Sequence, residues 1–126
     1  PTVLTPHPLE AARLLHTTAA QVQAHRLMAA RELAKKFQCT VALKGSGTVI
    51  AHRDAIPHIN PTGNGSLATA GTGDVLAGLI GAGLAAGMTP LQAAIRAGFV
   101  HGEVADAWPL DEPLTAGALA RRIRIG

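Results

Sequence analysis

The chain of 126 residues is long enough for one domain with a single hydrophobic core and too short for two. Hydrophobic residues make up 48% of it but aromatic residues only 2%, so small and branched aliphatic side chains must fill that core. The net charge of +3 comes from basic residues that mostly stand singly. Because the chain has no tyrosine and few other aromatic side chains to stack on bases, we expect no nucleic-acid partner.

Cysteine content, charge and hydropathy bear on location and assembly. The single cysteine, Cys39, excludes an internal disulfide and fits a reducing compartment, so we expect a cytoplasmic protein. Charged residues are 15% of the chain, which is low for a free-standing surface, and we expect a fragment or subunit that forms a homo-oligomer. Residues 75–95 carry no charge, but four glycines and a break at residues 88–90 favour two buried helices, so we expect no membrane partner.

The first part of the chain is predicted to pass from a strand into helices. Residues 3–4 end a strand, because Pro6 and Pro8 then prevent regular structure. A helix is predicted from about residue 9. A longer helix is predicted over residues 19–37, whose apolar side chains fall roughly on one face.

Extended segments and further helices follow. Residues 40–44, 48–51 and 56–60 are predicted to be extended, with a tight glycine turn between the first two. Helices are then predicted after Asp74, after Thr89 and after Thr115. This alternation of strands and helices predicts a layered α/β fold.

The sequence Gly71-Thr72-Gly73-Asp74 stands directly before a helix of small residues. A helix start presents unpaired amides and a positive dipole end to an anion, and glycines allow phosphate oxygens to approach the backbone. The motif is neither a Rossmann fingerprint, because Leu76 takes the place of its last glycine, nor a P-loop. If a substrate hydroxyl lay between Asp74 and a bound phosphate, Asp74 could accept its proton, as in a phosphotransferase. Alternatively, Thr72 or Asp74 only caps the helix.

Three segments in order resemble a known family: Leu4-Thr5-Pro6-His7-Pro8, Lys44-Gly45-Ser46-Gly47-Thr48 and residues 64–78. They are similar to the ribokinase-like fold and, more narrowly, to the ADP- or ATP-dependent NAD(P)H-hydrate dehydratases, often called carbohydrate kinases. The resemblance implies a three-layer α/β ribokinase-like fold. It also implies that residues 1–126 are the C-terminal part of one such domain, whose N-terminal part is absent, so that the fragment alone is inactive.

The resemblance also implies an activity and a set of site residues. The family repairs NADH or NADPH hydrated on the nicotinamide ring, using ADP or ATP to activate the ring hydroxyl for elimination. By resemblance, Asp74 contacts that hydroxyl as the base, Gly71, Thr72 and Gly73 form an anion hole, and His7 touches the hydrated dinucleotide. Lys44, Gly45, Ser46, Gly47, Thr48 and Gly73 bind the adenine nucleotide. Mg²⁺ is implied as the partner of the phosphates, held by phosphate and water oxygens with no protein ligand.

The chain departs from the family pattern at two places. Leu9 takes the position of a glycine before Glu10, and residues 63–66 read Gly-Asn-Gly-Ser where the family has Gly-Asn-Pro-Gly. Two other functions stay open: a ribokinase-like kinase for a sugar or vitamin-precursor hydroxyl, and a non-catalytic nucleotide-binding or assembly module.

Several single residues have simpler interpretations. Residues 44–48 could be only a hairpin turn, and His7 only a loop histidine. His52, Asp54 and His58 are interpreted as surface residues and not as metal ligands. His101 and Glu103 are set aside because no Pro-Cys-x-x-Cys completes a zinc site, and Trp108 is interpreted as a packing residue.

Overall fold

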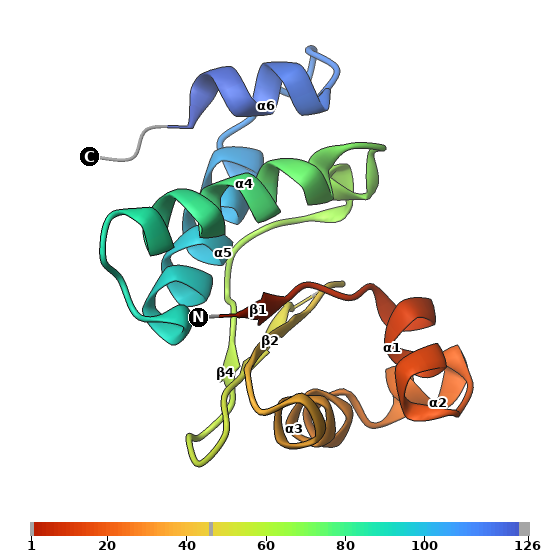
Figure 1. Cartoon of the computed structure of the whole chain (residues 1–126). Helices are drawn as coiled ribbons and strands as arrows, with labels where there is room; N and C mark the ends of the chain where they lie inside the picture. Colours follow the sequence, from red (N-terminus) through yellow and green to blue (C-terminus); the bar gives the residue numbers. More distant parts are fainter. Residues whose placement is uncertain (1, 46, 124–126) are drawn as a thin grey trace.

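The computed structural model describes residues 2–45 and 47–123 (Figure 1). Strands and helices alternate along them, as predicted. In chain order they are β1 (Val3–Leu4), α1 (Pro8–Leu15), α2 (Ala19–Ala24), α3 (Arg26–Phe37), β2 (Thr40–Leu43), β3 (Val49–Ala51), β4 (His58–Ile59), the 3-10 helix η1 (Gly65–Ala68), α4 (Thr72–Ala85), α5 (Pro90–Asp106) and α6 (Ala116–Arg122).

The strands form one mixed sheet in the order β1-β2-β3-β4. β1 pairs parallel to β2, with Val3 opposite Thr40, because α1, α2 and α3 supply the long crossover that a parallel pair requires. β2 and β3, like β3 and β4, are antiparallel neighbours. The tight turn between β2 and β3 therefore lies at the end of the sheet where β2 finishes.

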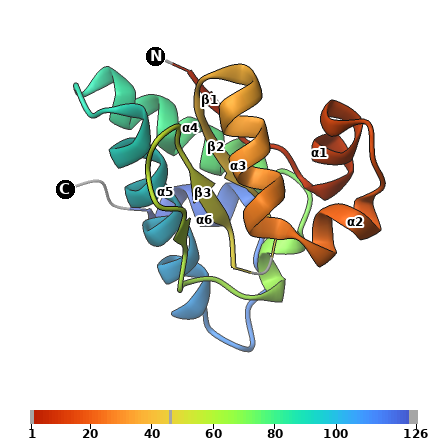
Figure 2. The ribbon, with the colours of Figure 1, turned by 90° about the horizontal axis from the view of Figure 1, so that it is seen from below.

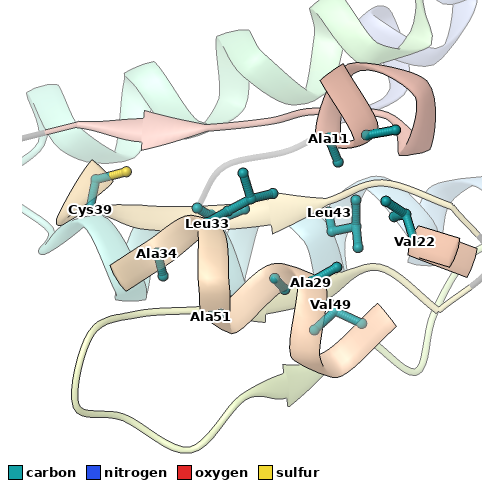
Figure 3. Packing of buried hydrophobic residues seen from close by; sticks show 12 residues of the cluster. Ala11, Val22, Ala29, Leu33, Ala34, Cys39, Leu43, Val49 and Ala51 are labelled. Carbon is teal, nitrogen blue, oxygen red and sulfur yellow. The ribbon is translucent and has the colours of Figure 1, made fainter. Parts of the chain in front are cut away.

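Side chains of β2 and β3 alternate between two cores, one on each face of the sheet. Val41 and Leu43 pack against α1, α2 and α3 (Figure 3), whereas Ala42 and Ile50 pack against Ala94 of α5. All five of these side chains are at most 1% exposed. Figure 2 shows α3 on one side of the strands and α5 on the other. The predicted layered α/β arrangement is confirmed.

The single helix predicted over residues 19–37 is wrong in one respect, because the chain breaks it at His25. His25 has φ −136° and ψ 55°, and it ends α2 and begins α3. No glycine or proline marks the break. The packing changes at this point: α2 packs mainly on α1, whereas α3 packs on β2 and β3 as well as on α1.

Of the three helix starts after residue 70, those of α5 and α6 agree with prediction, whereas α4 begins at Thr72 and not after Asp74. Thr89 and Gln92 form a reciprocal capping box with Pro90 in the first turn of α5, and Thr115 caps α6. α4 differs, since it begins after Gly71 at φ +85° with no side-chain cap. Among the described residues, no helix has the length and apolar character needed to cross a bilayer.

Candidate active site

A cavity of about 520 Å³ opens where five segments of the fold meet. Its walls come from the start of α1, the β2–β3 turn, the loop after β4, the start of α4 and one face of α5. Gly71 and Asp74 do not line it, and Ser46 lies outside the described residues. The size suits a small-molecule ligand. Of the predicted site residues it brings together His7, Lys44, Gly45, Gly47, Thr48, Thr72 and Gly73.

The β2–β3 turn has a backbone that needs glycine. Gly45 has φ +142° and Gly47 has φ +66°, values that a side chain would strain. The backbone N–H of Lys44 donates to the Pro6 carbonyl at 2.9 Å, which ties this turn to the loop before α1. On its other side the turn packs around the guanidinium of Arg26, which the sequence analysis did not single out.

Lys44 extends its side chain to the first turn of α4. A Cβ atom built on Gly73 would lie 2.9 Å from Lys44 Nζ, so the ammonium group lies close to the backbone at the start of α4, and a side chain at residue 73 would shift it from this place. In the part of the chain that the structure describes, the N–H of Gly73 has no hydrogen-bond partner. An ammonium group beside an unpaired amide at a helix start is an arrangement that binds phosphate.

Of the predicted anion hole, which comprises Gly71, Thr72 and Gly73, the Thr72 amide already has a partner, as has the amide of the neighbouring Asp74, and Gly71 does not line the cavity. The N–H of Thr72 donates to the Thr69 carbonyl at 3.3 Å, and that of Asp74 donates to the Gly71 carbonyl at 3.1 Å. The Thr72 hydroxyl lies 2.9 Å from the Thr69 carbonyl, to which it can donate. Gly73 therefore offers the one amide of the predicted anion hole that both belongs to the cavity wall and is open to a ligand without rearrangement.

Asp74 is exposed in the first turn of α4, one residue beyond the cavity wall at Gly73. Among the described residues its carboxylate has no hydrogen-bond partner, and α4 has no side-chain cap. The alternative in which Asp74 or Thr72 serves as the helix cap is therefore wrong, because Gly71 occupies that position. Asp74 thus places an exposed carboxylate next in the chain to Gly73, which lines the cavity.

His7 has a structural role that the sequence did not reveal. It is the N-cap of α1, with Nδ1 accepting from the N–H of Glu10 at 3.2 Å and Glu10 Oε1 accepting from the N–H of His7 at 3.1 Å. The hydrogen bond from the His7 backbone is the main reason that the pKa of Glu10 lies below its usual value. The imidazole also lines the cavity.

The loop after β4 is held against α5 by polar side chains. The buried Asn60 donates from Nδ2 to the Gly98 carbonyl at 2.9 Å. Asp106 accepts from the N–H of Gly63 at 2.9 Å and from Asn64 Nδ2 at 3.1 Å. A loop without sequence periodicity thus has one fixed course along the cavity wall.

His101, which the sequence analysis set aside, lies in this wall. Its Nε2 is 3.0 Å from the Thr72 carbonyl, and since a carbonyl only accepts, Nε2 must carry the hydrogen. Burial is the main reason that the pKa of His101 is lowered. The hydrogen bond to Thr72 opposes this to a smaller extent, and the nearby charge of Lys44 adds a still smaller lowering. One sequence signal could have identified His101: it falls on the same buried face of α5 as Ala94, Ala97 and Ala105.

The described residues contain no group of three His, Cys, Asp or Glu side chains placed to hold a metal ion. His52 instead lies with Nδ1 2.7 Å from the Thr40 hydroxyl. The cavity offers Lys44 and backbone amides, which suit an anion and not a bare cation. Trp108 packs with Leu114 and Leu119, and the Arg122 guanidinium lies 4.1 Å from the centre of its ring.

Known structures share this architecture. A ribokinase-like superfamily protein from Enterococcus faecalis V583 matches with a TM-score of 0.76 and 30% identity, over 94% of this chain and 41% of that one. The ADP/ATP-dependent NAD(P)H-hydrate dehydratase from Bacillus subtilis, co-crystallised with ATP and Mg²⁺, matches with a TM-score of 0.89 and 39% identity, over 96% of this chain and 45% of that one. The fold is therefore ribokinase-like, as the resemblance implied.

Sequence comparison narrows the class to one family. The Carb_kinase family, described as NAD(P)H-hydrate dehydratase, matches residues 1–124. The ADP-dependent (S)-NAD(P)H-hydrate dehydratase of Neisseria meningitidis serogroup B is 49% identical over 121 residues, which are 96% of this chain and 41% of that protein. The chain belongs to the NAD(P)H-hydrate dehydratase family, and it spans less than half the length of these two dehydratases.

Proposed function

We propose that residues 1–126 are the C-terminal part of a single domain that dehydrates hydrated NADH or NADPH, with ADP or ATP as the activating nucleotide. The names of its relatives support the reaction and the nucleotide. The observation that supports the site most directly is the contact of Lys44 Nζ with Gly73, whose N–H is unpaired at the start of α4. A terminal phosphate placed there would receive a charge-assisted bond and an amide bond.

The β2–β3 turn is the proposed nucleotide segment. Gly45, Gly47 and Thr48 line the cavity on the same side as Lys44, so a nucleotide can lie along the turn with its phosphates toward α4. His7 lies in the wall formed by the start of α1, and we assign it to the hydrated dinucleotide. Ser46 is kept in the nucleotide segment by family resemblance alone.

Asp74 is the proposed base. Its exposed carboxylate, next in the chain to Gly73, would accept the proton of the ring hydroxyl as that oxygen bonds to the terminal phosphorus and the bond from this phosphorus to the rest of the nucleotide breaks, which releases the shortened nucleotide. The positive end of α4 and Lys44 would stabilise the charge that develops on the phosphoryl oxygens. The oxygen then leaves the ring as part of a phosphate, and loss of a ring proton restores the double bond.

Mg²⁺ has no protein cage among the described residues, so we assign it no ligand side chain and no step. Phosphate oxygens and water satisfy this ion in many nucleotide sites. It would neutralise phosphate charge when bound with the nucleotide.

The test is Asp74→Asn in the full-length protein. Turnover is expected to fall at least about 100-fold, because the base is lost, while the Kd of ADP changes only a few-fold. Recovery of NADH absorbance from the hydrate measures turnover, and calorimetry measures the Kd. Asp111→Asn, at another exposed carboxylate, is the matched control and should leave both unchanged. If Asp74→Asn dehydrated the substrate as fast as the parent protein, Asp74 would not be the base.

The same assay separates the kinase alternative. A stable phosphorylated product from a sugar or vitamin-precursor alcohol, without recovery of NADH, would favour the kinase. No observation in the structure favours it, and both characterised relatives above are named dehydratases.

A further inference from the structure

Arg26 is the residue around which the β2–β3 turn is built. From the start of α3 its guanidinium donates to three carbonyls of the turn: Nη2 to Leu43 O and Gly47 O, each at 3.2 Å, and Nη1 to Lys44 O at 3.4 Å. Nη1 also donates to Gln23 Oε1 at 2.7 Å, across the break at His25. A planar guanidinium has five donors in fixed directions and can hold several carbonyls in one geometry, whereas an ammonium has three donors that rotate about a flexible stem.

The guanidinium of Arg26 fills the space beside Gly45 where any other residue would have its side chain. A Cβ atom on Gly45 would lie 2.8 Å from Arg26 Nη1, so the missing side chain of Gly45 is the place that the guanidinium occupies. The partial burial of Arg26 lowers its pKa, but an arginine remains charged at any physiological pH. A charged group held against three carbonyls makes stronger bonds than a neutral donor would.

These three bonds also determine where the amides of the turn point. In a trans peptide the N–H points opposite to the carbonyl of the same unit. Since the carbonyls of Lys44 and Gly47 face Arg26, the N–H groups of Gly45 and Thr48 point away from it. Gly45 and Thr48 line the cavity, whereas Arg26 does not.

We infer that Arg26 is a positioning residue for the nucleotide: it fixes the backbone of the β2–β3 turn so that its amides and Lys44 face the phosphates. This inference rests on the proposed function. It assigns Arg26 to nucleotide affinity and not to the chemical step or to the hydrated dinucleotide, because its contacts end at the turn.

The test uses Arg26→Gln and Arg26→Lys in the full-length protein, with Arg31→Gln as the control at an exposed arginine of the same helix. Arg26→Gln should raise the Kd of ADP, measured by calorimetry, by about 10- to 100-fold, as expected for lost bonds to a charged donor. Arg26→Lys should recover part of that loss. The KM of the hydrated dinucleotide and kcat at saturating nucleotide should stay within a few-fold, and Arg31→Gln should match the parent protein.

Each outcome tests either the role of Arg26 or the proposed dehydratase function. If Arg26→Gln leaves the Kd of ADP unchanged, or weakens both ligands equally, Arg26 is only a structural residue and the inference is overturned even if the parent protein dehydrates its substrate. If the parent binds ADP but does not dehydrate, and Arg26→Gln still weakens ADP alone, the proposed function fails and the inference stands. If Arg26→Gln does not fold, Arg26→Lys decides by the same comparison. If the parent protein does not bind ADP, the same comparison is made with ATP, and a parent protein that binds neither nucleotide overturns the inference.

Discussion

His7 shows how one imidazole can serve both the fold and the site. Its Nδ1 accepts the N–H of Glu10 in the cap of α1, so in the neutral ring only Nε2 can donate. Nε2 lies 3.3 Å from Glu10 Oε1, so a ligand in the cavity would share or replace that contact. The family motif pointed to His7 as a substrate residue, and nothing in the motif indicated the cap. The two roles can be separated because asparagine is as good an N-cap as any residue and lacks the ring.

His7→Ala is therefore expected to lower the free energy of unfolding by about 1 kcal/mol, whereas His7→Asn should leave it nearly unchanged. Both should raise the KM of the hydrated dinucleotide if the ring contacts it. Urea denaturation and steady-state kinetics measure the two effects. A KM that rises only for His7→Ala would show that the cap, and not the ring, matters to the site.

Single residues are also where sequence reasoning reached its limit. Lys44, Gly73 and His7 were identified because they belong to contiguous motifs, and the cavity brings them together. Arg26 and His101 were missed because each acts through carbonyls that are at least 17 residues away in sequence. No local pattern encodes such a contact, although a polar residue on a buried helix face is a usable signal.

At the scale of elements, the packing of α5 against the loop after β4 requires the two backbones to lie close together. A Cβ atom on Gly102 would lie 2.5 Å from the carbonyl carbon of Thr62 and 2.6 Å from the nitrogen of Gly63. Both are backbone atoms, so the loop would have to move. On Gly98, one turn earlier, a Cβ atom would meet its nearest neighbours at 3.6 Å, which is ordinary contact.

Gly102→Ala should therefore destabilise the protein by about 1–3 kcal/mol and displace the loop from the cavity wall. Gly98→Ala is the matched control and should be neutral or stabilising by up to about 1 kcal/mol, since alanine favours helix. Denaturant unfolding of both variants measures the difference. Equal stabilities would mean that the loop is not held against α5 as described.

The elements themselves were largely predictable, because helix and strand periods, capping residues and glycine turns are local. The exception is the break at His25, which no glycine or proline announces. It lies where the chain passes from α2, packed mainly on α1, to α3, which also packs on β2 and β3, and tertiary packing can override local helix propensity. The course of residues 61–65 was unpredictable for the same reason, since Asn60 and Asp106 fix it through α5.

At the scale of the molecule, His101 couples stability to pH. It is buried, it joins α5 to α4, and its folded pKa lies below the usual 6.5. The unfolded chain then binds a proton at this site more readily than the folded chain, so unfolding takes up a proton below pH 6.5 and stability falls as pH falls. Above that pH the effect is absent.

The melting temperature should accordingly decrease between about pH 7 and about pH 5.5, and His101→Gln should decrease less over the same range. Glutamine keeps a donor for the Thr72 carbonyl without titrating. His25→Gln, at an exposed histidine, is the control and should follow the parent. Parallel pH profiles for the parent and His101→Gln would show that burial of His101 does not contribute.

The hydrogen bond between the Lys44 N–H and the Pro6 carbonyl joins the turn assigned to the nucleotide to the loop that presents His7. Two ligands that each order one of these segments would partly order the other's binding surface. The consequence is cooperativity between them: ADP should bind more tightly in the presence of the dinucleotide. Linkage then requires the dinucleotide to gain affinity from ADP by the same factor, so the two substrates would assemble in either order but each more readily second than first.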